Sequence, residues 1–443
     1  MRHRFTVPLI AALATATLCA GPAQGADLMQ IYRQALVNDS VYASARAAQV
    51  AGQEREVQGR ATLLPAVGLG GSYTRNNSDT GAGTLDYSSN GYRLSLTQPL
   101  FNLGSWETYQ QGKLATALAD TQFAQAQQDL IVRVAQAYFD LLAAQDTLIF
   151  LQQQQQFISE QLASAKRNFE VGTATITDTN EAQARFDLGI AQEIAARNDL
   201  EVKRAALQQI VGDAPAKLAP LRPGVKLTAP EPAQIDLWVA SAENQNYEVL
   251  RQQLTLEIAR REIKRSRAGH APTVDLVASR SHSNSGIGNS ALGTGGTSDT
   301  NAIGIQWSIP LFSGFAVTSK VREAIALEDK ARSDLLFTQR TSAQAARQSF
   351  LGVNNGLAQV RALEAAEVSS RSALESNQLG YQVGVRINID VLNAEQQLYS
   401  TRRDLSKARY DTLMNGLRLK AAAGALREDD LEQVNRLLAN GNY

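Results

Sequence analysis

Two similar halves of the sequence, each divided by a pair of prolines, constrain the fold more than any other feature. The segment around Pro65 recurs around Pro272, that around Pro99 recurs around Pro310, and Val171-Gly172 recurs as Val383-Gly384. The offsets between the two halves range only from 207 to 212 residues. This spacing predicts two copies of one structural unit, residues 26–212 and 236–424, with a proline-rich linker at 213–235 and a C-terminal segment at 425–443.

Between the two prolines of each copy, the sequence alternates with a period of two. Apolar or small residues alternate with polar or small ones in both copies, for example at Val67, Leu69, Gly71 and Tyr73, and at Ile303, Ile305 and Trp307. Alternate residues of a strand face the same side of a sheet, so the pattern predicts one β-hairpin per copy, at 64–101 and 271–312. Glycine- and serine-rich segments, 76–91 and 284–301, are expected to be loops. Strands of about 10 residues can cross an outer membrane when they are tilted.

Aromatic residues lie at the ends of these expected strands. They are Tyr73, Tyr92, Phe101, Trp307 and Phe312. Aromatic side chains gather at both interfaces of membrane barrels, so their placement favours a membrane girdle. The alternative is a pair of solvent-facing hairpins on a soluble protein.

The remaining sequence is typical of helices. Residues 102–168 and 313–381 contain no proline and are rich in good helix formers, which predicts two helices of about 100 Å. Four shorter helices are expected at 27–60, 178–211, 236–268 and 388–423, so two short helices end to end match one long one. Spacings of four and three residues predict a coiled-coil seam along Leu130, Val134, Ala137, Leu141, Ala144, Leu148 and Leu151. The fold class is therefore mainly α with two β-hairpins.

The N-terminal segment, 1–25, has the basic start, apolar stretch and small-residue end of a secretory signal peptide. Cys19, the one cysteine, lies within it, and lipid attachment there is an alternative, although Leu18 precedes it where a small residue is needed. After this segment, no apolar run is long enough for a membrane helix. Equal numbers of basic and acidic residues, 43 each, argue against a nucleic-acid partner.

Catalytic chemistry finds no support in the sequence. His270 and His282 are the histidines beyond the signal peptide, His270 at a helix-to-strand junction and His282 in an expected loop. No phosphate-binding glycine loop and no metal-ligand cluster occurs in the sequence. We therefore expect neither an enzyme nor a protein that needs a cofactor or a metal.

Four strands cannot cross a membrane alone, because both sheet edges would leave backbone groups unpaired in hydrocarbon. Eight strands form a barrel filled by side chains, whereas twelve enclose a pore. Four helices per subunit give a matching twelve-helix ring. The sequence thus favours a homotrimer that completes a 12-stranded membrane β-barrel on a long α-helical barrel.

Several segments resemble the TolC family of trimeric outer-membrane channels, in the same order along the chain. They are Asp27-Leu28-Met29-Gln30, Ala137-Tyr138-Phe139, the strand entry from Gly269 to Leu276, and the two Val-Gly turns. The resemblance implies passive export of drugs or secreted polypeptides through a channel embedded in outer-membrane lipid and extending into the periplasm. It also implies two protein partners, a periplasmic adaptor and an inner-membrane transporter that supplies the energy.

The resemblance also assigns roles to residues near the two turns. It implies adaptor-docking tips at Val171-Gly172-Thr173 and Val383-Gly384-Val385, which by themselves are glycine helix stops. It implies closed-gate links from Tyr381 to Asp178 and from Arg386 to Thr177 and Asp178, and a constriction at Asp390 and Asn393. The TolC pattern has a second aspartate where this chain has Asn393. Helix capping is the simpler explanation for Asp178, through a capping box with Glu181, and for Asp390.

Two other protein classes stay open. A trimeric surface adhesin could also build a 12-stranded barrel, but such a protein keeps its strands together at one end of the sequence. A periplasmic coiled-coil scaffold would require the hairpins to be incidental.

Overall fold

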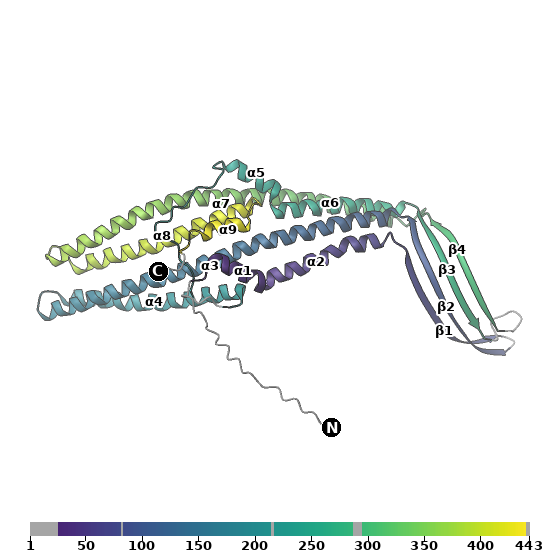
Figure 1. Cartoon of the computed structure of the whole chain (residues 1–443), viewed down its shortest axis with the longest axis horizontal. Coiled ribbons are helices and arrows are strands. Elements are labelled where there is room, and N and C mark those ends of the chain that lie inside the picture. The colour runs from purple at the N-terminus through teal and green to yellow at the C-terminus, as the bar shows by residue number, and fades with distance from the viewer. Residues whose placement is uncertain (1–24, 81–82, 214–216, 287–294, 440–443) are drawn as a thin grey trace, which may run out of the picture.

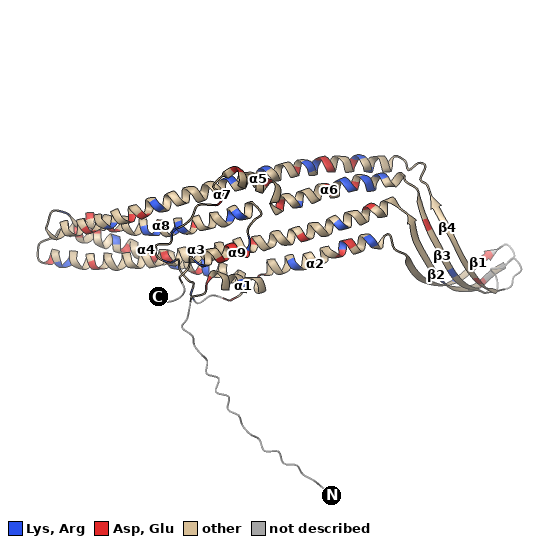
Figure 2. Cartoon of the chain, turned by 45° about the horizontal axis from the view of Figure 1, so that its top comes forward, with Lys and Arg blue, Asp and Glu red and all other residues tan. Residues whose placement is uncertain are grey.

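The computed structural model describes residues 25–80, 83–213, 217–286 and 295–439. Apart from Gly25, the expected signal peptide, including Cys19, lies outside the described residues. The chain forms an elongated stack of helices with a four-stranded sheet at one end (Figure 1). None of the described helices is long and apolar enough to cross a membrane. Basic and acidic residues are mixed along the helices (Figure 2).

Two very long helices run the length of the stack. They are α3, Leu103–Glu170, and α7, Ala316–Gln382, with 68 and 67 residues. Each is followed by a helix that returns beside it, α4 (Ile176–Val211) and α8 (Asn388–Ala422). Helices α2 (Ser40–Ala61) and α6 (Tyr247–Arg267) cover the ends of α3 and α7 that lie nearer the sheet. The predicted pairing of two short helices with one long helix is confirmed.

The helices expected at 27–60 and 236–268 are each broken in two, so these two predictions were wrong in the same way. Helix α1 (Leu28–Asn38) ends at Asp39, and α5 (Ile235–Gln245) ends at Asn246. Both residues adopt an extended conformation and cap the following helix, with side-chain oxygens that accept from Tyr42 N at 2.6 Å and Glu248 N at 2.8 Å. The apolar periodicity continues across such a cap and does not reveal it.

The sheet is antiparallel in the order β1-β2-β3-β4: Ala66–Thr80, Gly83–Phe101, Thr273–Ser285 and Gly296–Ser308. The strands are longer than expected, and much of the predicted loops 76–91 and 284–301 is strand. Polar pairs such as Asn77 Nδ2 with Asp86 Oδ1, at 2.8 Å, join the extended ends. Tyr73, Tyr92 and His282 consequently lie inside strands, not at strand ends or in a loop.

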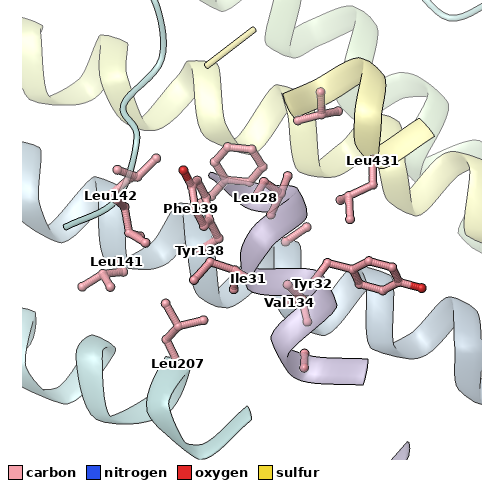
Figure 3. Close-up of a cluster of buried hydrophobic side chains, with 14 of the residues drawn as sticks. Leu28, Ile31, Tyr32, Val134, Tyr138, Phe139, Leu141, Leu142, Leu207 and Leu431 are labelled. Carbon is pink, nitrogen blue, oxygen red and sulfur yellow. The ribbon is translucent and has the colours of Figure 1, made fainter. Parts of the chain in front are cut away.

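The main hydrophobic core lies where the N-terminal helix, the linker and the C-terminal segment cross α3 (Figure 3). Helices α1 and α9 (Glu428–Asn435) pack on α3, and α4 and α8 contribute to the same cluster. The linker enters this core, because Tyr138 Oη donates to Ala219 O at 2.7 Å and Leu221 bridges to Leu438. Most of the predicted seam is buried in this cluster, together with residues of α1, α4, α8 and α9. One core therefore joins both copies of the repeat.

An ion pair fixes the break between α1 and α2. The Arg133 guanidinium donates to both oxygens of Asp39, each at 3.0 Å, and the Asp39 side chain is almost fully buried. Burial alone would raise the pKa of Asp39, but hydrogen bonds from Arg133 and Tyr42 N and the Arg133 charge lower it overall. A lowered pKa stabilises the fold above the ordinary value of 3.8, and this contribution is lost as the pH falls.

We therefore predict that Asp39→Ala lowers the free energy of unfolding at pH 7 by about 2–3 kcal/mol, because it removes a cap and leaves Arg133 unpaired. Asp39→Asn, which copies the Asn246 cap, should cost about 1 kcal/mol less. Both differences from wild type should shrink below pH 4. Denaturant unfolding at the two pH values checks this, and equal losses for Ala and Asn would contradict a capping role.

Candidate functional site at the helical tip and on the sheet

The two long helices end in equivalent turns at the end of the stack opposite the sheet (Figure 1). Gly172 and Gly384 have φ values of 77° and 79°, in the left-handed region that favours glycine. In the first turn, Thr173 N donates to Asn168 O at 2.8 Å, and in the second, Val385 N donates to Gly380 O at 2.9 Å. Both turns are therefore glycine helix stops of the same geometry.

These turns present apolar side chains to solvent. Val171, Val383 and Val385 are 73%, 64% and 75% exposed, and no atom would lie within 4 Å of a Cβ added to either glycine. Exposed apolar side chains that gather in one place favour a contact surface. All six residues of the expected docking tips thus lie in the two turns at this end.

Asp178 lies in the first turn of α4, but not as predicted. The N-cap is Thr175, whose Oγ1 accepts from Asp178 N at 3.2 Å, and Asp178 Oδ2 accepts from Thr175 N at 2.9 Å. The capping box is therefore Thr175 with Asp178, and the predicted box of Asp178 with Glu181 was wrong. The helix begins two residues earlier than expected, which moves Asp178 from the cap to the third helical position.

The other expected gate residues have different partners in the single chain. Tyr381 Oη accepts from Asn168 Nδ2 at 3.4 Å, and Arg386 Nη1 lies 3.6 Å from Asp390 Oδ2. Thr177 is exposed. Tyr381 therefore contacts Asn168, the residue that accepts the hydrogen bond of the first tip turn, and not Asp178.

Asp390 and Asn393 lie close together on the part of α8 that is turned away from the buried residues Val391 and Leu392. The N-cap of α8 is Ile387, and no side-chain hydrogen bond caps this end. Asp390 is the third helical residue, so the predicted capping role of Asp390 was wrong. Asn393 is exposed, and its Oδ1 accepts from Arg185 Nη2 of α4 at 2.9 Å. Asp390 therefore places a carboxylate near the tip, and Asn393 places beside it an amide that is hydrogen-bonded to Arg185.

Two polar residues near the tip were not predicted from the sequence: Arg185 of α4 and Glu395 of α8. Arg185 also donates to Gln396 Oε1, and it links α4 to α8. Glu395 is fully buried, one turn beyond Val391 and Leu392 and one turn before Leu398. A glutamate within an apolar helical stripe was the signal that could have revealed it.

One face of the sheet is apolar and the other is small or polar. The register places Leu69, Leu94 and Arg280 side by side, and likewise Val67, Leu96, Ala278 and Ile303. A bulge between Pro99 and Phe101 returns Phe101 to this apolar face, opposite Val274. The other face carries Gly68, Gly70, Ser72, Ser95, Thr97 and Gly304.

The apolar band runs obliquely across the strands. The edge of the band farther from the helices is formed by Tyr73 on β1 and Tyr92 on β2. Tyr73 pairs with Asn90 of β2, so it lies two residues farther from the helices than Tyr92. On β3 and β4 the band begins only at Ala278 and Ile303, at the level of Leu96. Over the three steps from β1 to β4 the band shifts on average by about two residues per strand, a slope of about 55° from the strand rise and spacing. Strands in membrane barrels tilt by about 35–45°, so such a tilt would bring the band much closer to level in a membrane.

The aromatic residues mark the two edges of this band. Tyr73 and Tyr92 lie at the distal edge, and Phe101 and Trp307 lie at the edge near the helices, paired with Val274. Phe312 follows β4 and is 75% exposed. Among the residues that the structure describes, no cluster of three or more His, Cys, Asp or Glu side chains is placed to hold a metal ion.

Comparison with known proteins gives consistent results. The family model described as outer membrane efflux protein matches residues 31–213 and 238–425. "Outer membrane protein TolC" of Escherichia coli (strain K12) is 34% identical over 424 residues, which cover 94% of this chain and 86% of that protein. "Alkaline protease secretion protein AprF" of Pseudomonas aeruginosa is 36% identical, over 94% of this chain and 88% of that protein.

Solved structures support the fold. The Campylobacter jejuni CmeC outer membrane channel superposes with a TM-score of 0.79 at 17% identity, over 94% of this chain and 90% of that one. At this identity the likeness shows the fold alone.

Proposed function

The chain belongs to the outer membrane efflux protein family and is an outer-membrane efflux or secretion channel protein, and we propose that three copies assemble into one continuous duct. The observation that carries this proposal is the sheet, which has an oblique apolar face and two edges without a neighbour. Within the described residues, β1 pairs only with β2 and β4 pairs only with β3. Three sheets joined edge to edge close a 12-stranded barrel and leave a pore.

The helices extend this pore away from the membrane. At 1.5 Å per residue, α3 and α7 are each about 100 Å long, and they end at the two tip turns. The helical part of the duct would therefore carry the pore deep into the periplasm, while the sheet remains in the outer membrane.

The tip turns are the proposed docking site for a periplasmic adaptor. Their exposed valines and the free space around Gly172 and Gly384 support a helical partner that packs against them. The duct has no energy source of its own, so an inner-membrane transporter is proposed to drive export through the adaptor. AprF, a relative along almost the whole chain, is named for protease secretion, which favours secreted polypeptides as cargo, with drugs as the second candidate.

The closed gate is proposed to form in the assembled channel. It requires Tyr381 and Arg386 to reach Asp178 and Thr177, whereas Asp178 Oδ2 is engaged by Thr175 and Arg386 lies beside Asp390 in the single chain. Closing would therefore exchange the Arg386–Asp390 pair for a pair with Asp178. Three Asp390 carboxylates would then remain to line the constriction, beside three Asn393 amides.

We predict that the purified protein is a trimer in mild detergent and that it conducts ions in planar bilayers without nucleotide or added metal. Edge closure of the sheet requires three copies, and a passive pore requires no cofactor. Cross-linking followed by electrophoresis measures the first property, and single-channel recording measures the second. Cross-linked species no larger than dimers, or bilayers without channel conductance, would contradict the proposal.

For docking, we predict that Gly384→Val impairs export by at least tenfold while trimer levels in the outer membrane stay nearly normal. Valine disfavours the φ of 79° and would distort the exposed turn. The control is Gly416→Val, a glycine within α8 that also has no atom within 4 Å of an added Cβ. Export of a secreted polypeptide measures the effect. Equal export by wild type and Gly384→Val would show that the turn is not the docking site.

For the constriction, we predict that Asp390→Ala lowers the preference of the open channel for cations, because three carboxylates disappear from its narrowest part. Asn393→Asp should increase this preference. Reversal potentials in a salt gradient measure both variants. If Asp390→Ala leaves the reversal potential unchanged, Asp390 acts only on its own helix.

A further inference from the structure

Buried polar atoms without hydrogen-bond partners gather near the helical tip. Among the described residues, eight buried side-chain atoms have no partner, and six of them belong to Gln155, Thr179, Asn388 and Glu395. Asn388 and Glu395 each contribute two of these atoms. They are seven residues apart on α8, so they share one face of that helix. The buried face of α8 therefore contains polar side chains whose hydrogen-bonding groups have no partners.

Glu395 is the most buried member of this group. Its side chain is 0% exposed in the single chain, and neither carboxyl oxygen has a partner. Val391 and Leu398 on the same side of α8 pack with Leu374 of α7. Leu392 packs with Ile158 of α3 and Ala182 of α4. Because its own chain already covers Glu395 completely, a neighbouring subunit has no access to it in this packing.

The charged groups around Glu395 do not offset the free-energy cost of burying an ionised carboxylate there. Arg185 of α4 is the charge that acts on it, but Arg185 is engaged by Asn393 and Gln396. On α8 itself, Tyr399 adjoins Glu395 and Arg402 follows. Farther out, α3 contributes Glu160, which acts on Tyr399, and α7 contributes Glu367, which Arg402 holds at 3.1 Å.

Burial raises the pKa of Glu395 to about 9, although the Arg185 charge acts in the opposite direction. The carboxyl is therefore neutral at pH 7 in this packing. A carboxyl exposed to water has an ordinary pKa near 4.5 and would be ionised at the same pH. Any separation of α8 from α3 and α7 that admits water is accordingly coupled to the release of a proton.

We infer that Glu395 is a proton-linked gating residue, protonated while α8 is packed at the tip and ionised when α8 separates and the tip opens. This inference rests on the proposed channel function. It concerns a residue outside the constriction and outside the proposed gate links. The buried carboxyl opposes closure at high pH, and its protonation permits closure at low pH.

The direction of the effect follows from the two protonation states. The packed tip holds a proton that the open tip releases, so rising pH favours opening. Between about pH 4.5 and about pH 9, the opening equilibrium should increase by up to about tenfold per pH unit in each subunit. Glu395→Gln keeps the size and neutrality of the protonated side chain and removes the proton that is released.

The test uses the full-length protein in planar bilayers between about pH 5.5 and about pH 8.5, above the range in which ordinary carboxylates titrate. Resting conductance of the wild type should rise with pH. Glu395→Gln should conduct less at neutral pH and lose this rise. The control Glu375→Gln, an exposed glutamate on α7, should behave as wild type. A Glu395→Gln channel that keeps the wild-type pH response would overturn the inference.

A second readout does not depend on conduction. Infrared spectroscopy at neutral pH should show a protonated carboxyl in wild type and in Glu375→Gln, and the part of this signal that comes from Glu395 should be missing from Glu395→Gln. A wild-type spectrum without it would overturn the assignment of Glu395, even if the channel conducts. Silent bilayers with the infrared signal present would count against the proposed channel and leave the protonated state of Glu395 established.

Discussion

The rest of the structure depends on a sheet that cannot be stable alone. Its four strands present an apolar face and two edges whose backbone groups have no neighbour within the described residues. In water the apolar face would be exposed, and in lipid the edges would be unpaired. The proposed closure with further copies would satisfy both conditions. The oblique course of the apolar band, from Tyr73 to Ile303, fits the tilt of strands in such a closed barrel.

The internal repeat supplies the helical wall that this closure needs. Each copy contributes one hairpin, one long helix and shorter helices beside it, so the wall has an even height. The copies are held together where α1, the linker and α9 cross α3, around Tyr138 and Leu431. This core lies midway between the sheet and the tip (Figure 1). The core is well packed, whereas the helix contacts nearer the tip contain unsatisfied polar groups, so a change of packing at the tip is expected to cost less free energy than one at the core.

Most of the fold was predictable from the sequence, because proline pairs and periodicity report directly on backbone geometry. The positions of the strand ends could not be predicted, because polar residues such as Asn77 and Asp86 are typical of loops and yet pair across the strands here. The breaks at Asp39 and Asn246 were missed because a cap leaves the apolar period intact. At the tip, the glycine turns were predictable from residue type alone. The partners of Asp178 and the burial of Glu395 depend on side-chain packing between helices distant in sequence, which periodicity does not report.

The central claim is that β4 of one subunit pairs with β1 of the next, and disulfide trapping tests it most directly. After removal of the expected signal peptide the chain has no cysteine, so Ile305→Cys can be combined with cysteine at Leu69, Gly71 or Tyr73. Within one chain, β1 and β4 are three strand spacings apart, about 14 Å, which is beyond the reach of a disulfide. We expect covalent trimers in the outer membrane for at least one of these pairs, most strongly at position 73 if the slope of the apolar band continues between subunits. If all three pairs gave only uncrosslinked monomers, pairing of β4 with β1 of the next subunit would be contradicted.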